Sequence, residues 1–277
     1  MEAMIKNIVV HLTGSDEDEV RLEAAEGLAA AFNAHLTGLL MHVDPEIAVM
    51  PEAAYAGVGP ELIQEEREKT ERRRKALTIQ FDKMGVPNDL RVVEGWRSTI
   101  GGAMAAEAHV ADLFVGTRPY GDPNKEQFLE EGVLFGSGTP CLLLPPGYRA
   151  SMPPQTVLVA WKSTRECARA TRDAIPFMLQ ARQVVVAFAT ERADEERHNS
   201  SAADVARYLS RHGISLEVRE MAGWEAADEA ILTEAKDQGA DLIVAGAFGH
   251  SRLQERVMGG VTRTLLTRCE LPVLLSR

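Results

Sequence analysis

Short apolar segments alternate with longer amphipathic segments along the chain, and this order is repeated in the second half. Apolar runs rich in β-branched residues predict strands, whereas apolar residues at helical spacing predict helices. The strands expected in the first half are 5–12, 36–43, 90–93, 112–116 and 141–144, with helices at about 15–32, 61–84, 99–109 and 125–135. The strands expected in the second half are 156–161, 184–188, 215–219, 240–246 and 272–275, with helices at about 163–179, 194–212, 225–238 and 260–268. This alternation predicts an α/β protein with two tandem, doubly wound parallel sheets of five strands, each covered by helices on both faces.

The internal repeat is most evident at the fourth strand of each half. Ala111–Gly116 aligns with Ala240–Gly246, with one residue of slack, and Thr139–Leu144 aligns with Leu271–Ser276. Asp112 and Asp241 precede these strands, and we interpret them as loop or capping residues. The two last strands are apolar enough to pair with each other, which would make the chain an internal pseudo-dimer.

A proline-rich connector separates the two halves. The stretch 145–154 contains four prolines and one glycine, so neither a helix nor a strand continues through it. We therefore predict one domain at 1–146, a linker at 147–154 and a second domain at 155–277.

Composition and charge limit the kinds of partner. The chain has 277 residues and a formal net charge of −11, which disfavours binding to nucleic acid or to an anionic membrane. No apolar run approaches the roughly 20 residues of a membrane helix, and the first ten residues lack the basic and apolar regions of a secretion signal. Three scattered cysteines fit neither a disulfide framework nor a metal site, and Cys141 is expected to be buried. These features predict a cytoplasmic protein.

Several conspicuous side chains have simple structural interpretations. The charged run 61–75 places glutamate four residues before a cation, the favoured orientation for pairs on a solvated helix face. The expected pairs are Glu65–Lys69, Glu68–Arg72 and Glu71–Lys75. The sequence Ser163-Thr164-Arg165-Glu166 is typical of a capping box at the start of a helix. Trp96 and Trp224 precede the third helix of each half and are interpreted as packing residues.

The segment 242–262 combines a strand, a glycine loop and a helix start. The strand ends at Gly246, Gly249 follows, and Gly259 and Gly260 open the last predicted helix. Glycine leaves backbone N–H groups accessible, and a helix start adds unpaired N–H groups with a partial positive charge. The pattern predicts a cradle for phosphate, and a purely structural turn is the alternative. His250 lies inside this loop, where it would contact a phosphate or cap the turn.

Two halves of this kind, with Gly246-x2-Gly249-x9-Gly259 after the fourth strand of the second half, resemble the universal stress protein family in its tandem form. The resemblance covers nearly the whole chain and is strongest over 240–276. It implies the strand order 3-2-1-4-5 in each half, a fold related to the adenine nucleotide alpha hydrolases, and, as in some members, ATP binding.

The resemblance also implies which residues of the second half bind the nucleotide. They are Gly246, Gly249, His250, Gly259, Gly260, Val261, Thr262, Lys162, Ala160, Trp161, Ala187 and Phe188. Backbone groups near Ala187 and Phe188 would form hydrogen bonds with the edge of the adenine base. Two positions depart from the family pattern: Gly260 replaces a serine or threonine, and Lys162 replaces an aspartate. Thr262 matches a second hydroxyl position.

The first half lacks this motif. Thr13 stands where the family has its aspartate, and Pro119, Asp122 and Pro123 follow the fourth strand instead of the glycine pattern. Proline removes N–H donors and aspartate repels an anion, so no phosphate site is expected there.

The favoured function is a cytoplasmic stress-response sensor or adaptor that binds ATP or AMP in its C-terminal half. Mg²⁺ would accompany ATP, no cofactor is required, and no residue spacing indicates a metal site. The protein partner is not identified, and a homodimer of the whole chain is compatible with the sequence. No general base is evident, so the chain is expected not to be an enzyme beyond a weak ATPase activity. The alternatives are a nucleotide-independent scaffold, which Gly260 and Lys162 favour, and a weak ATP hydrolase.

Overall fold

The computed structural model describes residues 5–44, 55–118, 128–149, 152–189, 195–221, 226–247 and 260–277. The strands are β1 (Asn7–Leu12), β2 (His35–Asp44), β3 (Asn88–Trp96), β4 (Leu113–Thr117), β5 (Cys141–Leu144), β6 (Thr156–Ala160), β7 (Gln183–Ala189), β8 (Glu217–Met221), β9 (Leu242–Gly246) and β10 (Val273–Ser276). The helices are α1 (Glu17–Phe32), α2 (Tyr55–Phe81), α3 (Ile100–Ala108), α4 (Phe128–Gly136), α5 (Arg165–Asp173), α6 (Ile175–Gln180), α7 (Glu195–Arg211), α8 (Ala227–Asp237) and α9 (Gly260–Arg268).

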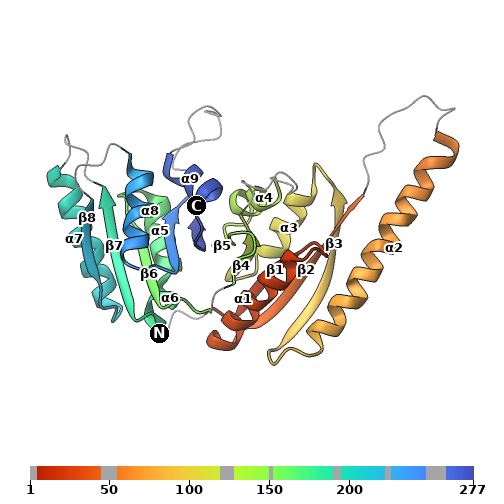
Figure 1. Cartoon of the computed structure of the whole chain (residues 1–277), viewed down its shortest axis with the longest axis horizontal. Helices are drawn as coiled ribbons and strands as arrows, with labels where there is room; N and C mark the ends of the chain where they lie inside the picture. Colours follow the sequence, from red (N-terminus) through yellow and green to blue (C-terminus); the bar gives the residue numbers. More distant parts are fainter. Residues whose placement is uncertain are drawn as a thin grey trace.

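All of these strands lie in one ten-stranded sheet with the order β3-β2-β1-β4-β5-β10-β9-β6-β7-β8 (Figure 1). Within each half the pairing is parallel and the order is 3-2-1-4-5, as predicted. The halves join through β5 and β10, which pair antiparallel with Leu142 opposite Leu274. The predicted fold class and the pairing of the two last strands are therefore confirmed.

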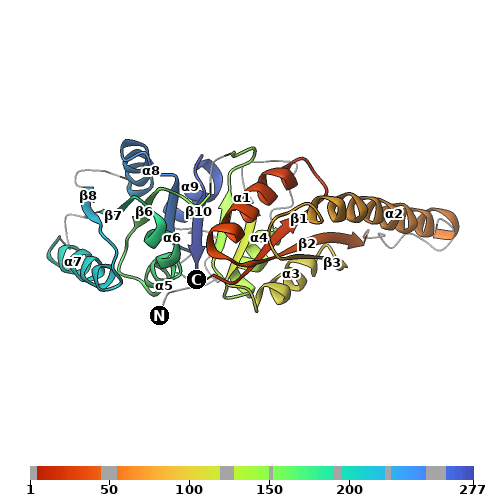
Figure 2. The ribbon, with the colours of Figure 1, turned by 90° about the horizontal axis from the view of Figure 1, so that it is seen from below.

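Two hydrophobic cores cover the two faces of the sheet, and each extends through both halves. Successive residues of a strand point to opposite faces, so Ile8 and Val10 enter one core and Val9 enters the other. The first core is completed by α1, α2, α5, α6 and α7, and the second by α3, α4, α8 and α9. Figures 1 and 2 place α2 at the outer end of the first half, where it packs beside β2 and β3.

Polar and aromatic contacts reinforce the join between the halves. The Arg118 guanidinium donates to the Cys269 carbonyl at 2.8 Å, and the Arg277 guanidinium lies 4.7 Å from the centre of the Phe135 ring. Phe32 of α1 meets Phe177 of α6 edge to face at 5.4 Å. The junction is therefore packed like a domain interior.

Asp112 and Asp241 have the same structural role in the two halves. Asp112 accepts hydrogen bonds from the backbone N–H groups of Lys6 and Asn7 at 2.8 and 2.9 Å, at the start of β1. Asp241 accepts from Gln155 and Thr156 at 2.9 and 2.8 Å, at the start of β6. Their interpretation as capping residues is confirmed.

The helix expected at 163–179 is interrupted. It forms two helices, α5 and α6, with Pro176 in the first turn of the second. Proline has no N–H to continue the ladder and its ring clashes with the carbonyl four residues earlier, so an uninterrupted helix was the wrong prediction. The N-cap is Thr164 rather than Ser163, since the Thr164 hydroxyl accepts from the Cys167 N–H at 3.3 Å.

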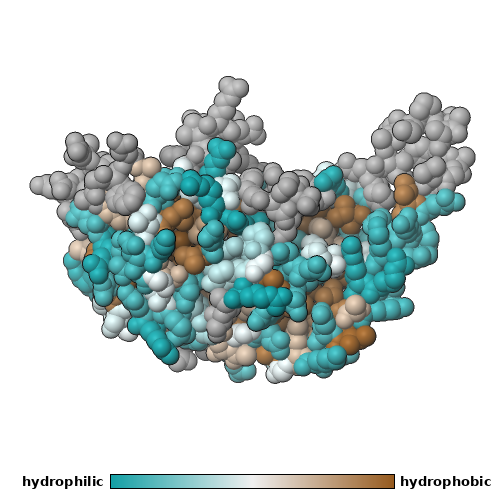
Figure 3. Space-filling view, viewed as in Figure 1, coloured by the Kyte–Doolittle hydropathy of each residue, from teal (hydrophilic) through white to brown (hydrophobic). Residues whose placement is uncertain are grey.

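The charged helix α2 begins at Tyr55, earlier than predicted, within a stretch whose glycines and proline indicated irregular structure. The low helix propensity of glycine and proline is a weak preference, and the rest of a long helix can outweigh it. Glu68–Arg72 and Glu71–Lys75 form at 3.9 and 3.8 Å, but Lys69 contacts Glu66 at 2.6 Å rather than Glu65. Figure 3 shows a hydrophilic surface over the described part of this helix, which confirms a solvated face.

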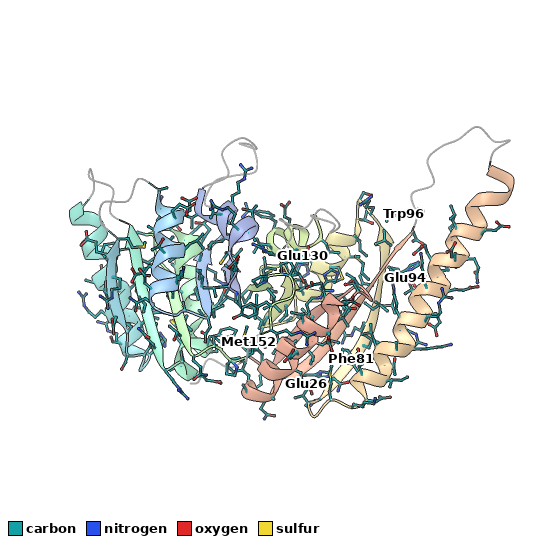
Figure 4. The ribbon with its side chains drawn as sticks, in the orientation of Figure 1. Glu26, Phe81, Glu94, Trp96, Glu130 and Met152 are labelled. Carbon is teal, nitrogen blue, oxygen red and sulfur yellow. The ribbon has the colours of Figure 1, made fainter. Side chains whose placement is uncertain are left out.

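Trp96 is 50% exposed at the end of β3, so its interpretation as a packing residue was wrong (Figure 4). Trp96 is the last residue of β3, which is the edge strand of the described sheet. Trp224 lies outside the described residues. All three cysteines are free and buried, as expected for Cys141. Within the described ranges, no helix is both long and apolar enough to span a bilayer.

Candidate functional site

Open α/β sheets bind ligands beyond the carboxyl ends of their strands, at the point where the strand order reverses. This sheet has two such points, one between β1 and β4 and one between β6 and β9. Different residues lie at these two points. The candidate site is the point in the second half, where the predicted glycine motif begins.

In the second half, the end of β9 meets the start of α9. The buried Thr262 hydroxyl donates to the Gly246 carbonyl at 3.4 Å, which ties the first turn of the helix to the last residue of the strand. Gly249, His250 and Gly259 lie outside the described residues. The structure thus brings together the two ends of the predicted phosphate cradle, at Gly246 and at Gly260–Thr262.

Gly246 is required by close packing. A Cβ added there would lie 2.5 Å from the Cys167 backbone nitrogen and 2.7 Å from the Glu166 carbonyl carbon. The first turn of α5 therefore lies directly against the end of β9, and only glycine leaves room for it.

Gly260 has no such packing role. It is exposed, and a Cβ added there would meet no described atom closer than Asp228 Oδ2 at 3.8 Å. The N–H groups of a first helical turn have no acceptor within their helix and carry a partial positive charge. Gly260, Val261 and Thr262 form this first turn of α9.

The other predicted residues lie at the ends of β6 and β7. Ala160 and Ala187 are neighbours in register, and the Trp161 N–H donates to the Ala187 carbonyl at 2.8 Å. The Phe188 side chain is buried, so only its backbone would be offered to a ligand. Lys162 is exposed immediately beyond β6.

Two carboxylates near this site were missed from the sequence. Glu166 is buried at the start of α5, where hydrogen bonds from Arg165, the helix backbone and Thr164 outweigh burial and lower its pKa. Asp228, in the first turn of α8, accepts a hydrogen bond from Thr264 of α9 at 2.7 Å. Both residues match the sequence pattern of acids in a first helical turn, but that pattern does not reveal which ones face a ligand crevice.

In the first half, a buried arginine fills the equivalent crevice. Arg21 of α1 is 1% exposed and donates to the Thr117 hydroxyl at the end of β4 at 3.0 Å and to the Thr13 hydroxyl beyond β1 at 3.1 Å. It also forms an ion pair with Asp18, which accepts from the Thr13 N–H at 2.9 Å. The protein's own guanidinium therefore occupies the point where the strand order reverses.

His11 is buried beside this cluster, with Nδ1 at 3.3 Å from the Glu130 carboxylate of α4. Neither ring nitrogen makes a well-aligned hydrogen bond to a described atom. Burial lowers the pKa of His11 below its ordinary 6.5; Glu130 opposes this, Arg21 adds to it and Asp18 opposes it more weakly. The imidazole is therefore neutral in the folded protein.

This geometry predicts a stability that falls on mild acidification. Below pH 6.5 the unfolded chain takes up the His11 proton that the folded protein resists, so the free energy of unfolding should fall with decreasing pH, by up to about 1.4 kcal/mol per pH unit. Urea denaturation at pH 7.5, 6.5 and 5.5 would measure the decline. The decline in the free energy of unfolding should become smaller in His11→Gln. It should persist in the control variant His35→Gln, because the His35 imidazole is exposed. An equal decline in His11→Gln would exclude His11 as its cause.

No group of three or more His, Cys, Asp or Glu side chains within the described part of the chain is arranged to hold a metal ion. The candidate site therefore lies in the second half of an open, doubly wound α/β fold, where the end of β9 meets the start of α9.

Comparisons with known proteins agree with this architecture. Residues 154–277 match the sequence profile of the Universal stress protein family. Universal stress protein Slr1230 of Synechocystis is 29% identical over 150 residues, which are 53% of this chain and 50% of the Synechocystis protein. The match therefore spans about half the length of that relative.

Solved structures match the chain over almost its full length. A universal stress protein from Archaeoglobus fulgidus superposes with a TM-score of 0.75 at 16% identity, covering 99% of this chain and 97% of the other. A functionally unknown protein of Pseudomonas aeruginosa, PA1789, gives a TM-score of 0.59 at 18% identity, covering 98% and 92%. At these identities the likeness concerns the fold.

The C-terminal half of the chain belongs to the universal stress protein family, and the resemblance recognised from the sequence is confirmed. The match to the Archaeoglobus structure extends the same fold to both halves.

Proposed function

We propose that the C-terminal half binds an adenine nucleotide, AMP or ATP with Mg²⁺, and that the protein acts in the cytoplasm as a stress-linked sensor or adaptor. The observation that carries this proposal is the Thr262–Gly246 hydrogen bond, which joins the helix start to the strand end at the point where the strand order reverses. Phosphate would accept from the first N–H groups of α9, and the base would lie toward the ends of β6 and β7.

The first half supports the proposal by contrast. Arg21 lies at the point where its strand order reverses, pairs with Asp18 and donates to the hydroxyls of Thr13 and Thr117. We therefore assign residues 1–146 to a degenerate domain without a phosphate site, joined by the linker 147–154 to a binding domain at 155–277. The first half would offer a surface to a protein partner.

A scaffold role without nucleotide is the second candidate. It is favoured by Gly260, which supplies no hydroxyl, and by Lys162, which stands where the family has an aspartate. Hydrolysis is the weakest candidate, because Asp228, a carboxylate beside the start of α9, already accepts a hydrogen bond from Thr264 at 2.7 Å. We propose that any ATPase activity is incidental.

Thermal unfolding with AMP, ATP or ATP and Mg²⁺ tests the proposal. At a ligand concentration 100 times the Kd, binding contributes about 2.7 kcal/mol, so the Tm should rise by roughly 5 °C or more. Gly260→Asp places a negative charge at the start of α9 in open space and should weaken binding by about tenfold or more. Gly260→Ser is the matched neutral control and should retain binding. An unchanged Tm at millimolar nucleotide would favour the scaffold instead.

A further inference from the structure

A carboxylate lies beside the proposed phosphate position. Asp228 Oδ2 is 3.8 Å from the Cβ that a side chain at Gly260 would have. The Thr264 hydroxyl holds the same oxygen from the next turn of α9, at 2.7 Å. Asp228 is therefore fixed in place at the start of the helix that would bind an anion, although it belongs to α8.

The surroundings of Asp228 favour its charged form. The hydrogen bond from Thr264 lowers its pKa, burial opposes this, and the backbone N–H groups of Asp228 and Glu229 and the charge of Arg268 lower it further. Arg268 is itself paired with Glu229 at 2.7 Å, and both side chains are exposed. At neutral pH the start of α9 thus faces a negative charge, and Arg268, the described cation that acts on it, is already paired with Glu229.

This arrangement opposes the attraction of the helix start for anions. A first helical turn carries about half a positive charge, whereas the carboxylate carries a full negative charge. A phosphate bound at the Gly260 N–H would lie well within the screening length of about 8 Å at physiological salt. The repulsion increases with each charge on the ligand, so it discriminates between nucleotides by their number of phosphates.

We propose that Asp228 determines the charge specificity of this site, favouring a ligand with a single phosphate over one with a triphosphate. This inference rests on the proposed nucleotide site and names the ligand class within it. Asp228 acts through space on the phosphates. A capping role for α8 is compatible with this but would not by itself alter the choice of ligand.

Titration calorimetry of the whole protein with AMP and with ATP, both in EDTA, tests this inference. Asp228→Asn keeps the size of the side chain and an oxygen that can accept from Thr264, while removing the charge. It should lower the Kd for ATP by about tenfold and change that for AMP by less than about threefold. In 1 M NaCl, where the screening length is about 3 Å, the difference between wild type and variant should shrink.

Thr264→Val is the matched control for structure. It removes the hydroxyl that contacts Asp228 but leaves the carboxylate, so it should lower stability while keeping the preference for AMP. An Asp228→Asn variant that binds both nucleotides with the wild-type ratio of Kd values would overturn the inference. So would a variant that loses ATP binding, since the carboxylate would then be contributing to affinity.

Inorganic tripolyphosphate separates failure of this inference from failure of the proposed function. If neither protein bound a nucleotide but Asp228→Asn bound tripolyphosphate more tightly than wild type, the nucleotide proposal would fall and the role of Asp228 would stand. If neither protein bound any of these anions, both would be overturned.

Discussion

Arg21→Met is expected to lower the free energy of unfolding by about 3–5 kcal/mol. The substitution leaves the buried Asp18 carboxylate without its cationic partner, and an uncompensated buried charge is costly. It also removes the donors to the Thr13 and Thr117 hydroxyls, which hold the ends of β1 and β4 together. Urea denaturation followed by circular dichroism would measure the loss.

Arg169→Met is the control, because Arg169 is a partly exposed arginine on α5, the first helix of the second half. Its side chain is 46% exposed and pairs with Asp173 at 2.9 Å, so its loss should cost less than about 1 kcal/mol. The double variant Asp18→Asn with Arg21→Met removes both charges and should recover part of the stability. An Arg21→Met protein as stable as the control would show that the ion pair contributes nothing net.

The role of Arg21 could not be predicted from the sequence. It lies in an acidic stretch at the start of a helix, where an arginine is usually solvated, and only the tertiary arrangement directs it between two strand ends. From the missing glycines and the prolines beyond β4, the sequence predicts no phosphate site in this half, and those prolines lie outside the described residues. The sequence gives no sign that the Arg21 guanidinium lies at the point where the strand order reverses.

The strands were predictable for a simple reason. Most are short apolar runs buried on both faces and bounded by turn residues, so composition separates them from their neighbours. The edge strands β3 and β8 are half-buried or exposed along most of their length. The helices were less exact at their ends: α2 starts earlier than its polar pattern indicates, and Pro176 divides α5 from α6. Helix ends depend on local hydrogen bonds and on packing, which a periodic pattern does not record.

The candidate site was predicted in part. The approach of Gly246 to Thr262 follows from a strand and a helix that share one glycine motif, and the structure brings them together. Asp228 and Glu166 come from other helices, so their proximity to the crevice depends on how those helices pack. No sequence motif marks a carboxylate that repels a ligand. Such a residue is identified only when the structure shows which helix starts lie next to each other.

The second large effect is expected at the join between the halves. Phe177→Ala should lower the free energy of unfolding by about 3–5 kcal/mol, because it removes a fully buried ring and leaves a cavity against Phe32. Leu179→Ala is the control within the same helix. Leu179 is 44% exposed, so its truncation should cost less than about 1 kcal/mol.

A double-mutant cycle with Phe32→Ala addresses the contact itself. Edge-to-face aromatic pairs contribute about 0.5–1.5 kcal/mol beyond their buried area, so the double variant should be more stable than the sum of the two single losses predicts. Strict additivity would mean that the rings stabilise their own halves separately. A coupling within the expected range would instead show that the two halves are joined by helix packing as well as by the β5–β10 pair, so that unfolding of one half destabilises the other.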